Sequence, residues 1–259
     1  MDWLNLYFPG FLLFFCRINS FFVVAPVFSA RNVPAQFKIG LAFFVSFIAF
    51  VGTGSAATVA MDSLYVLSVI REILVGLLLG FTAYLFFTVV QIAGSFIDMQ
   101  MGFGIANVID PMTGAQSPII GNLKYMIATL LFLTFNGHHF LLEGIMRSYE
   151  WIPLSNELFA KTYNGQISEF MVKTFGTVFS LSFQMAAPLV VALFLTDVGL
   201  GLLARVAPQF NIFVVGLPIK ILLGFVLLGF LFPSYEDIFR NVFNDMLDTL
   251  TQFFGLFKA

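Results

Sequence analysis

The sequence predicts an all-α integral membrane protein, and composition and segment length are the two observations that predict it. Of the 259 residues, 59% are hydrophobic and only 10% are charged, whereas soluble domains carry about a quarter charged residues. The apolar runs are too long for strands, and no strict alternation of the kind found in membrane barrels is present. The chain therefore needs lipid or other apolar proteins to cover its surface.

The helices follow from the apolar runs taken in chain order. A membrane-spanning helix needs about 20 mostly apolar residues. About six stretches meet or approach that length: Leu4–Val27, Ile39–Met61, Ile73–Ile97, Tyr125–Met146, Phe170–Thr196 and Phe210–Phe232.

Proline and glycine are expected to shape several of these helices. Pro26, Pro188 and Pro218 should each break or kink a helix, because proline lacks the backbone donor and clashes with the preceding turn. Gly76 and Gly80 form a small-xxx-small pair, which lets two membrane helices approach closely.

The C-terminal residues read differently from the rest. We expect residues 1–235 to form one helical membrane domain and residues 236–259 to form an amphipathic helix with acidic polar positions. Its apolar positions recur at helical spacing: Ile238, Val242, Met246 and Leu250. An anionic membrane surface prefers Lys and Arg on the polar face, so a protein groove and an interfacial position both remain open.

Composition argues against several functional classes. The net charge of −2 provides no basic field for nucleic acid. Cys16 is the single cysteine, which excludes an internal disulfide and a cysteine metal cluster. His138 and His139 are adjacent, so they diverge by about 100° on a helix instead of sharing a face. We expect no metal, no cofactor and no catalytic site.

Charged residues inside the apolar runs are more informative. Arg17 lies within the first run and Lys220 within the last, where a lipid-facing charge costs roughly 2.5–3.5 kcal/mol. They should therefore face protein, water or a carboxylate such as Asp98 or Asp197. Together with Arg205 we group these as buried polar residues, which a transporter would use as ion sites and an assembly would use to hold subunits together.

The central stretch DMQMGFGIANVIDPMTGAQSPII, residues 98–120, interrupts the apolar pattern. It contains three glycines, three methionines and almost no charge, so it is less polar than an ordinary surface loop. Glycine permits unusual backbone conformations, and methionine adapts to irregular apolar surroundings.

Four stretches resemble the FliR family of flagellar biosynthetic and type III export-gate proteins. They are RINSFFVVAPVFSARNVPAQFKIGLA (17–42), QIAGSFIDMQMGFGIANVIDP (91–111), LFLTFNGHHFLL (131–142) and AAPLVVALFLTDVGLGLLARVAPQFNIFVVGLPIKILLG (186–224). They occur in the family's order, and the resemblance extends over nearly the whole chain.

The resemblance implies a non-catalytic core subunit of the flagellar export gate. Its implied partners are FliP- and FliQ-like subunits, an FlhB-like subunit at the C-terminal side, membrane lipid and, transiently, exported flagellar proteins. The implied location is the bacterial cytoplasmic membrane, within the flagellar basal body. The alternatives are a virulence-type injectisome homologue and a secondary transporter for small solutes.

In the resembled family, the loop that matches residues 103–118 helps to plug the export pore. We therefore expect the plug to involve the larger side chains of this loop: Phe103, Ile105, Val108, Ile109, Pro111 and Met112. A hydrophobic constriction can close a pore by excluding water. A connector packed between helices remains the alternative.

Overall fold

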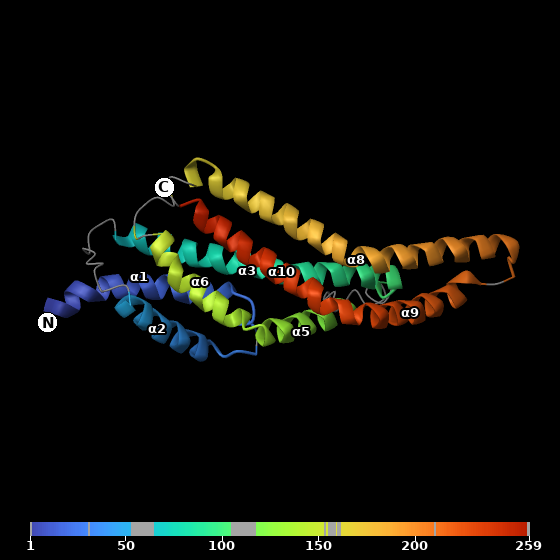
Figure 1. Ribbon diagram of the computed structural model, residues 1–259, viewed down its shortest axis with the longest axis horizontal. Coiled ribbons are helices and arrows are strands. Elements are labelled where there is room, and N and C mark those ends of the chain that lie inside the picture. Colours follow the sequence, from blue (N-terminus) through green and yellow to red (C-terminus); the bar gives the residue numbers. More distant parts are fainter. Residues whose placement is uncertain are drawn as a thin grey trace. The chain divides into compact units, whose positions relative to one another are not determined.

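The structure is a computed structural model, and it describes residues 2–30, 32–52, 65–104, 118–152, 154, 159, 162–209 and 211–257. All regular elements in these ranges are helical (Figure 1), which confirms the all-α prediction. In chain order they are α1 (Asp2–Val24), α2 (Ala35–Gly52), α3 (Tyr65–Met101), α5 (Ile119–Thr134), α6 (Gly137–Trp151), α8 (Gln166–Val206), α9 (Ile212–Leu231), the 3₁₀ turn η1 (Phe232–Ser234) and α10 (Tyr235–Gly255).

Most of these helices are long and apolar enough to cross a membrane. Within the described ranges, five helical segments qualify by length and composition, with α9 and α10 counted as one. A sixth is obtained if α5 and α6 are taken together as one broken span. This agrees with the expected integral membrane protein of about six apolar helices.

The boundaries of three predicted stretches differ from those of the helices. The stretch Tyr125–Met146 is not one helix, because Asn136 adopts a left-handed conformation with φ of 57° between α5 and α6. α3 and α8 are 37 and 41 residues long, well beyond the apolar runs from which they were predicted. Both helices continue through the polar residues beyond those runs, because polar side chains alone do not end a helix.

The prolines behave in two ways. Pro26 lies two residues beyond Val24, the last residue of α1, and the next residue, Val27, has a positive φ of 69°. Pro188 and Pro218 instead lie inside α8 and α9, whose helical assignment continues through both positions.

The chain divides into two compact units. Unit 1 contains Met1–Leu85, Phe135–Phe175 and Asn244–Ala259. In this unit α1 packs closely against α3 through the predicted small-xxx-small pair. A Cβ at Gly76 would collide with the backbone of Arg17, and one at Gly80 would lie 2.9 Å from the carbonyl oxygen of Phe21.

Unit 2 contains Phe86–Thr134 and Gly176–Phe243. Its core includes three phenylalanines from α3, α5 and α10. The ring centroids of Phe87 and Phe132 are 5.0 Å apart, and the ring of Phe243 lies 5.7 and 5.2 Å from them. This cluster packs the first part of α10 onto α3 and α5.

The apolar side of α10 is covered by the chain itself. Val242, Met246 and Leu250 are buried, with at most 8% of their surface exposed. Within unit 1, the rings of Phe253 and Phe170 lie 5.3 Å apart. Three of the four expected apolar positions are therefore buried within the chain, and Ile238 is half-buried. The separation of residues 236–259 from a 1–235 domain stays a prediction.

Candidate functional site

One carboxylate joins the two ends of the central segment. Asp98, near the end of α3, is 5% exposed. Both of its carboxylate oxygens accept a hydrogen bond from the backbone N–H of Ile120 at 3.1 Å, and one also accepts from the N–H of Gly121 at 3.2 Å. The first N–H groups of a helix have no partner within the helix. Asp98 therefore caps the start of α5 from a distant position in the sequence.

The end of α3 is fixed by a Schellman motif. Gly102 has a φ of 96°, a left-handed conformation that favours glycine. The N–H of Phe103 donates to the carbonyl of Asp98 at 3.0 Å, and that of Gly102 donates to the carbonyl of Met99 at 3.2 Å. These two bonds are the ones that define the motif. The chain consequently leaves α3 in a defined direction.

Three close approaches at glycines hold this region of unit 2 together. A Cβ at Gly94 of α3 would collide with the backbone of Gly121 in α5. At the end of α3, Gly102 lies against the side chain of Leu217 in α9, and a Cβ at Gly224 would meet the side chain of Met101. We refer to this junction of α3, α5 and α9 around Asp98 as the stem of the central segment.

Of the six predicted plug residues, only Phe103, at the edge of the stem, lies among the described residues. Phe103 is half-buried, and its ring makes an edge contact with that of Phe225 in α9 at 6.4 Å. The other five side chains lie outside the described residues: Ile105, Val108, Ile109, Pro111 and Met112. Their role as a plug stays a prediction.

Lys124 lies one helical turn beyond the residues that Asp98 caps. It is only 2% exposed, and its ammonium lies 4.8 Å from the centroid of the Tyr235 ring. Neither Lys124 Nζ nor Tyr235 Oη has a hydrogen-bond partner in the part of the chain that the structure describes. The stem thus buries one acidic and one basic side chain, Asp98 and Lys124.

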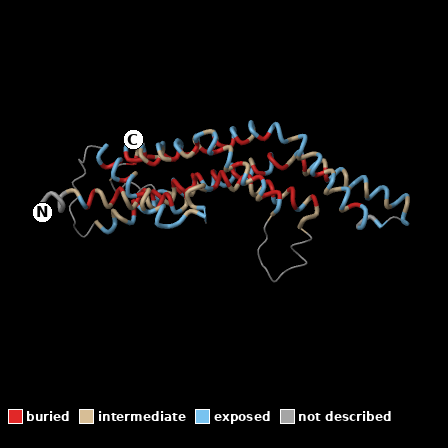
Figure 2. The backbone as a smooth tube through the Cα atoms, turned by 90° about the horizontal axis from the view of Figure 1, so that it is seen from below, coloured by how far each residue is buried: buried red, intermediate tan, exposed pale blue. Residues whose placement is uncertain are grey.

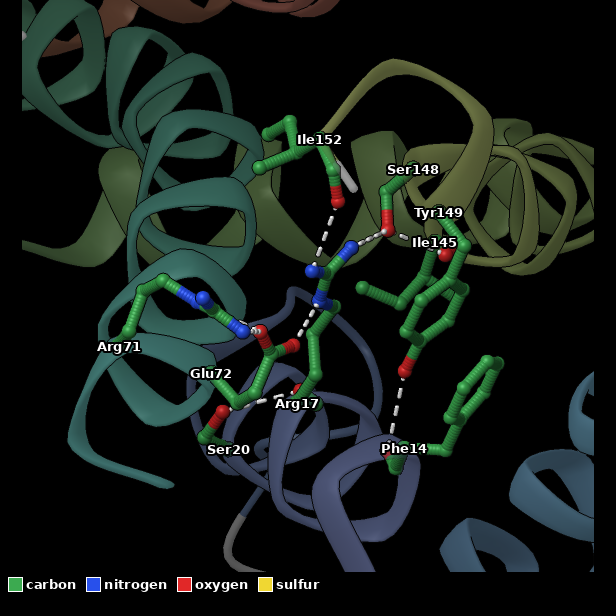
Figure 3. Close-up of polar contacts among 9 residues, drawn as sticks. All are labelled: Phe14, Arg17, Ser20, Arg71, Glu72, Ile145, Ser148, Tyr149 and Ile152. Atoms are coloured by element: carbon green, nitrogen blue, oxygen red, sulfur yellow. Dashed lines mark hydrogen bonds and ion pairs between the residues drawn. The ribbon is translucent and has the colours of Figure 1, made fainter. Parts of the chain in front are cut away.

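Unit 1 contains a second buried polar cluster, centred on Arg17 (Figure 3). The guanidinium of Arg17 donates to the carboxylate of Glu72 at 2.5 Å, to Ser148 Oγ at 3.0 Å and to the carbonyl of Ile152 at 2.9 Å. Arg71 contacts the other oxygen of the same carboxylate at 2.7 Å. Arg17 therefore ties α1 to α3 and to the end of α6.

Two stacked aromatic rings complete this cluster. The Arg17 guanidinium carbon lies 4.1 Å from the centroid of the Tyr149 ring, a geometry favourable for a cation–π interaction. The Tyr149 hydroxyl donates to the carbonyl of Phe14 at 3.1 Å, and the two rings stack with centroids 3.9 Å apart. These contacts show that Arg17, which was expected to face protein, water or a carboxylate, is fully buried against protein groups.

Sequence reasoning did not identify Glu72 as the partner of Arg17. The two residues are 55 positions apart, and Glu72 stands in an ordinary charged pair with Arg71. One signal was available, since Glu72 is the acidic residue nearest the start of the third apolar stretch. Its side chain is fully buried, as a carboxylate that neutralises a buried guanidinium must be.

A third polar group joins α3, α8 and α9 in unit 2. One carboxylate oxygen of Asp197 accepts hydrogen bonds from Lys220 Nζ at 2.9 Å and from Gln100 Nε2 at 2.8 Å. Lys220 thus contacts one of the two carboxylates that the sequence suggested. Arg205, in the last turn of α8, is exposed.

The described side chains offer no apparent metal centre. Groups of three or more His, Cys, Asp or Glu residues in a metal-binding arrangement do not occur among them. The rings of His138 and His139 lie 4.1 Å apart and have no acidic or cysteine companions in such a group.

Long apolar helices that bury paired charges between them define an integral membrane protein held together by interhelical polar contacts. The model of the family described as "Bacterial export proteins, family 1" matches residues 8–246. The chain belongs to this family, in the branch of the FliR flagellar biosynthetic proteins.

Three relatives illustrate this membership. The chain is 47% identical over 249 residues to the flagellar biosynthetic protein FliR of Bacillus subtilis, with 96% of each chain covered. It is 34% identical to FliR of Escherichia coli, covering 97% of this chain and 95% of the relative. It is also 29% identical to the Yop proteins translocation protein T of Yersinia pestis, covering 82% of this chain and 81% of the relative.

Proposed function

We propose that the chain is a non-catalytic core subunit of the flagellar type III protein export gate. It forms part of the pore that passes unfolded flagellar proteins across the cytoplasmic membrane. The observation that carries this proposal is the match of nearly the whole chain to flagellar biosynthetic proteins at up to 47% identity. The helices capable of crossing a membrane are consistent with that role.

The flagellar assignment is preferred over the virulence-type alternative. The relatives of 47% and 34% identity are flagellar biosynthetic proteins. The Yop translocation protein T is a more distant member of the same family, at 29%.

The partners we propose are FliP- and FliQ-like subunits, with an FlhB-like subunit at the C-terminal side, in the cytoplasmic membrane and the flagellar basal body. Large apolar side chains on α8 and α9 support such an assembly. Phe179, Phe194, Leu222 and Phe230 are each more than half exposed, and exposed apolar surface of this extent requires lipid or protein cover. Several subunits packed around a pore would provide both.

We further propose that residues 103–118 close the pore at rest. The stem supports this role because it holds the two ends of the segment on packed helices through Asp98 and Gly102. Because its two ends are held on packed helices, the segment can move out of the pore while the surrounding helices remain in place. The segment does no chemistry in this scheme, and the energy-consuming steps of export belong to partners.

Expression with and without partners tests the proposal. Produced alone, the chain should aggregate or be degraded, because its exposed apolar surface is left uncovered. Co-expression with FliP- and FliQ-like subunits should yield a stable complex on size-exclusion chromatography in mild detergent. A stable, monodisperse monomer that does not associate with these subunits would contradict the proposal and favour a small-solute transporter.

A further inference from the structure

Among the residues that the structure describes, both donors to the Asp197 carboxylate contact the same oxygen. Lys220 and Gln100 both donate to Oδ2, at 2.9 and 2.8 Å. No residue that the structure describes donates to Oδ1. The side chain of Asp197 is 40% exposed, compared with 15% for Lys220, so the carboxylate is the more accessible partner of the pair.

The surface around this oxygen is apolar. Phe194, one helical turn before Asp197, is 57% exposed, and Val198 is 46% exposed. Both belong to the C-terminal half of α8, in which most residues are exposed or half-buried (Figure 2). The exposed side chains there are mostly apolar. A carboxylate oxygen that meets hydrocarbon without a hydrogen bond is strongly unfavourable. Lipid is therefore a poor cover for this position.

The charge balance indicates what kind of group completes the site. Lys220 already neutralises Asp197, so a second cation would leave an uncompensated positive charge in a poorly polarisable environment. A neutral donor, such as an amide or a hydroxyl, satisfies the oxygen without adding charge. Side chains of this kind form hydrogen bonds between helices within membranes.

The backbone beside Asp197 leaves room for a helix to carry that donor. Gly201 is one turn further along and on the same side of α8. It is exposed, and a Cβ built there meets nothing within 4 Å. Small residues at such positions allow two helices to approach closely.

We infer that the side of α8 formed by Phe194, Asp197 and Gly201 binds an apolar helix of a neighbouring gate subunit, which donates a neutral hydrogen bond to Asp197 Oδ1. This inference rests on the proposed function as an assembly subunit. It deepens that function by identifying one docking surface and the chemistry of the group that fits it.

Photo-cross-linking in the assembled complex tests the surface directly. A photoreactive amino acid at position 201 should form an adduct with another subunit. Position 199 is a matched control, because Gly199 is equally open but lies about 200° around the helix from both Asp197 and Gly201. Adducts to another subunit from position 201 but not from position 199 are expected. Adducts only to lipid, or only within the chain itself, from position 201 would overturn the inference.

Two variants test the hydrogen bond. In Asp197→Asn, Lys220 and Gln100 hold the amide oxygen, so the NH₂ group points outward and opposes the incoming donor. In the double variant Asp197→Leu with Lys220→Leu, the acceptor is lost and no charge is left unpaired. Both should lower the amount of complex recovered by about three- to fifteenfold, the range that corresponds to one membrane hydrogen bond, at unchanged membrane levels of the chain.

The outcomes separate this inference from the proposed function. Wild-type recovery of complex by both variants would overturn the docking surface, while the assembly role would stand. Failure of the unmodified chain to form any complex would instead overturn the proposed function.

Discussion

The carboxylate of Asp98 caps the first turn of α5 by accepting a hydrogen bond from the backbone N–H of Ile120 at 3.1 Å, across 22 positions of the sequence. The central segment lies between these two residues. Its ends are therefore joined by a side-chain contact within unit 2, independently of the conformation of the residues between them.

Removal of this cap should weaken the stem. Asp98→Ala leaves two buried N–H groups without their acceptor, and the loss of a helix cap costs about 1–2 kcal/mol. The thermal unfolding midpoint of the purified complex should fall accordingly. Asp98→Asn keeps one acceptor oxygen and should have a smaller effect. Equal midpoints for Asp98→Ala and the unmodified protein would show that the contact contributes nothing.

Helix contact at Gly94 should not tolerate a side chain. In Gly94→Ala the new methyl group meets the backbone of Gly121, which cannot rotate away, so α3 and α5 must separate. A loss of about 1–3 kcal/mol is expected, as for other overpacked sites. Gly229→Ala in α9 is the control, because a Cβ there meets nothing within 4 Å and alanine is the better helix former. A destabilisation by Gly229→Ala as large as that by Gly94→Ala would argue against a specific contact.

Charge removal in the Arg17 cluster should have unequal effects. Glu72→Gln removes the carboxylate charge that both Arg17 and Arg71 contact, whereas Arg17→Met leaves Glu72 still paired with Arg71. Breaking a buried pair in this way costs about 3–5 kcal/mol, so Glu72→Gln should reduce the level of folded chain in the membrane more than Arg17→Met does.

An exposed ion pair provides the comparison for that experiment. Arg147 and Glu143 lie 2.7 Å apart with side chains 64% and 51% exposed. Arg147→Ala should change stability by no more than about 0.5 kcal/mol. If Arg17→Met proved the more damaging change, the contacts of Arg17 to Ser148 and Ile152 would matter more than the shared carboxylate of Glu72.

Pore closure should depend on the apolar character of the central segment. Ile105→Asp combined with Val108→Asp should favour a wetted pore and make the membrane leaky to small ions. Deletion of Gly104–Ser117, bridged by a short glycine linker, should do so more strongly. A membrane-potential dye reports the leak, and Ile105→Leu with Val108→Ile is the conservative control. An assembled deletion variant in a tight membrane would exclude the plug, and loss of assembly without a leak would indicate a packed connector.

The sequence was sufficient to predict the helical membrane architecture because lipid-spanning segments have a strong compositional signature. It also predicted a close helix approach at Gly76, and it indicated that Lys220 would face protein, water or a carboxylate such as Asp98 or Asp197. The break between α5 and α6 was missed, although its signal was present, since the Asn136–Gly137 pair is a strong turn former.

The contacts across long sequence separations could not be predicted in the same way. Nothing local distinguishes Glu72 as the partner of Arg17, because the pairing depends on how α1 and α3 meet. The capping role of Asp98 was hidden for a similar reason. A cap is normally sought immediately before its helix, whereas this one comes from the preceding helix, 22 positions away.

A cap supplied from so far away has a practical consequence for protein engineering. Because Asp98 and Gly102 define where the central segment leaves and rejoins the helices, its length and composition can be varied without changing the scaffold. Doubling the length of a flexible loop adds only about 0.6 kcal/mol of closure entropy. The stem is thus a grafting point, at which central segments from other export proteins can be exchanged and compared on one common support.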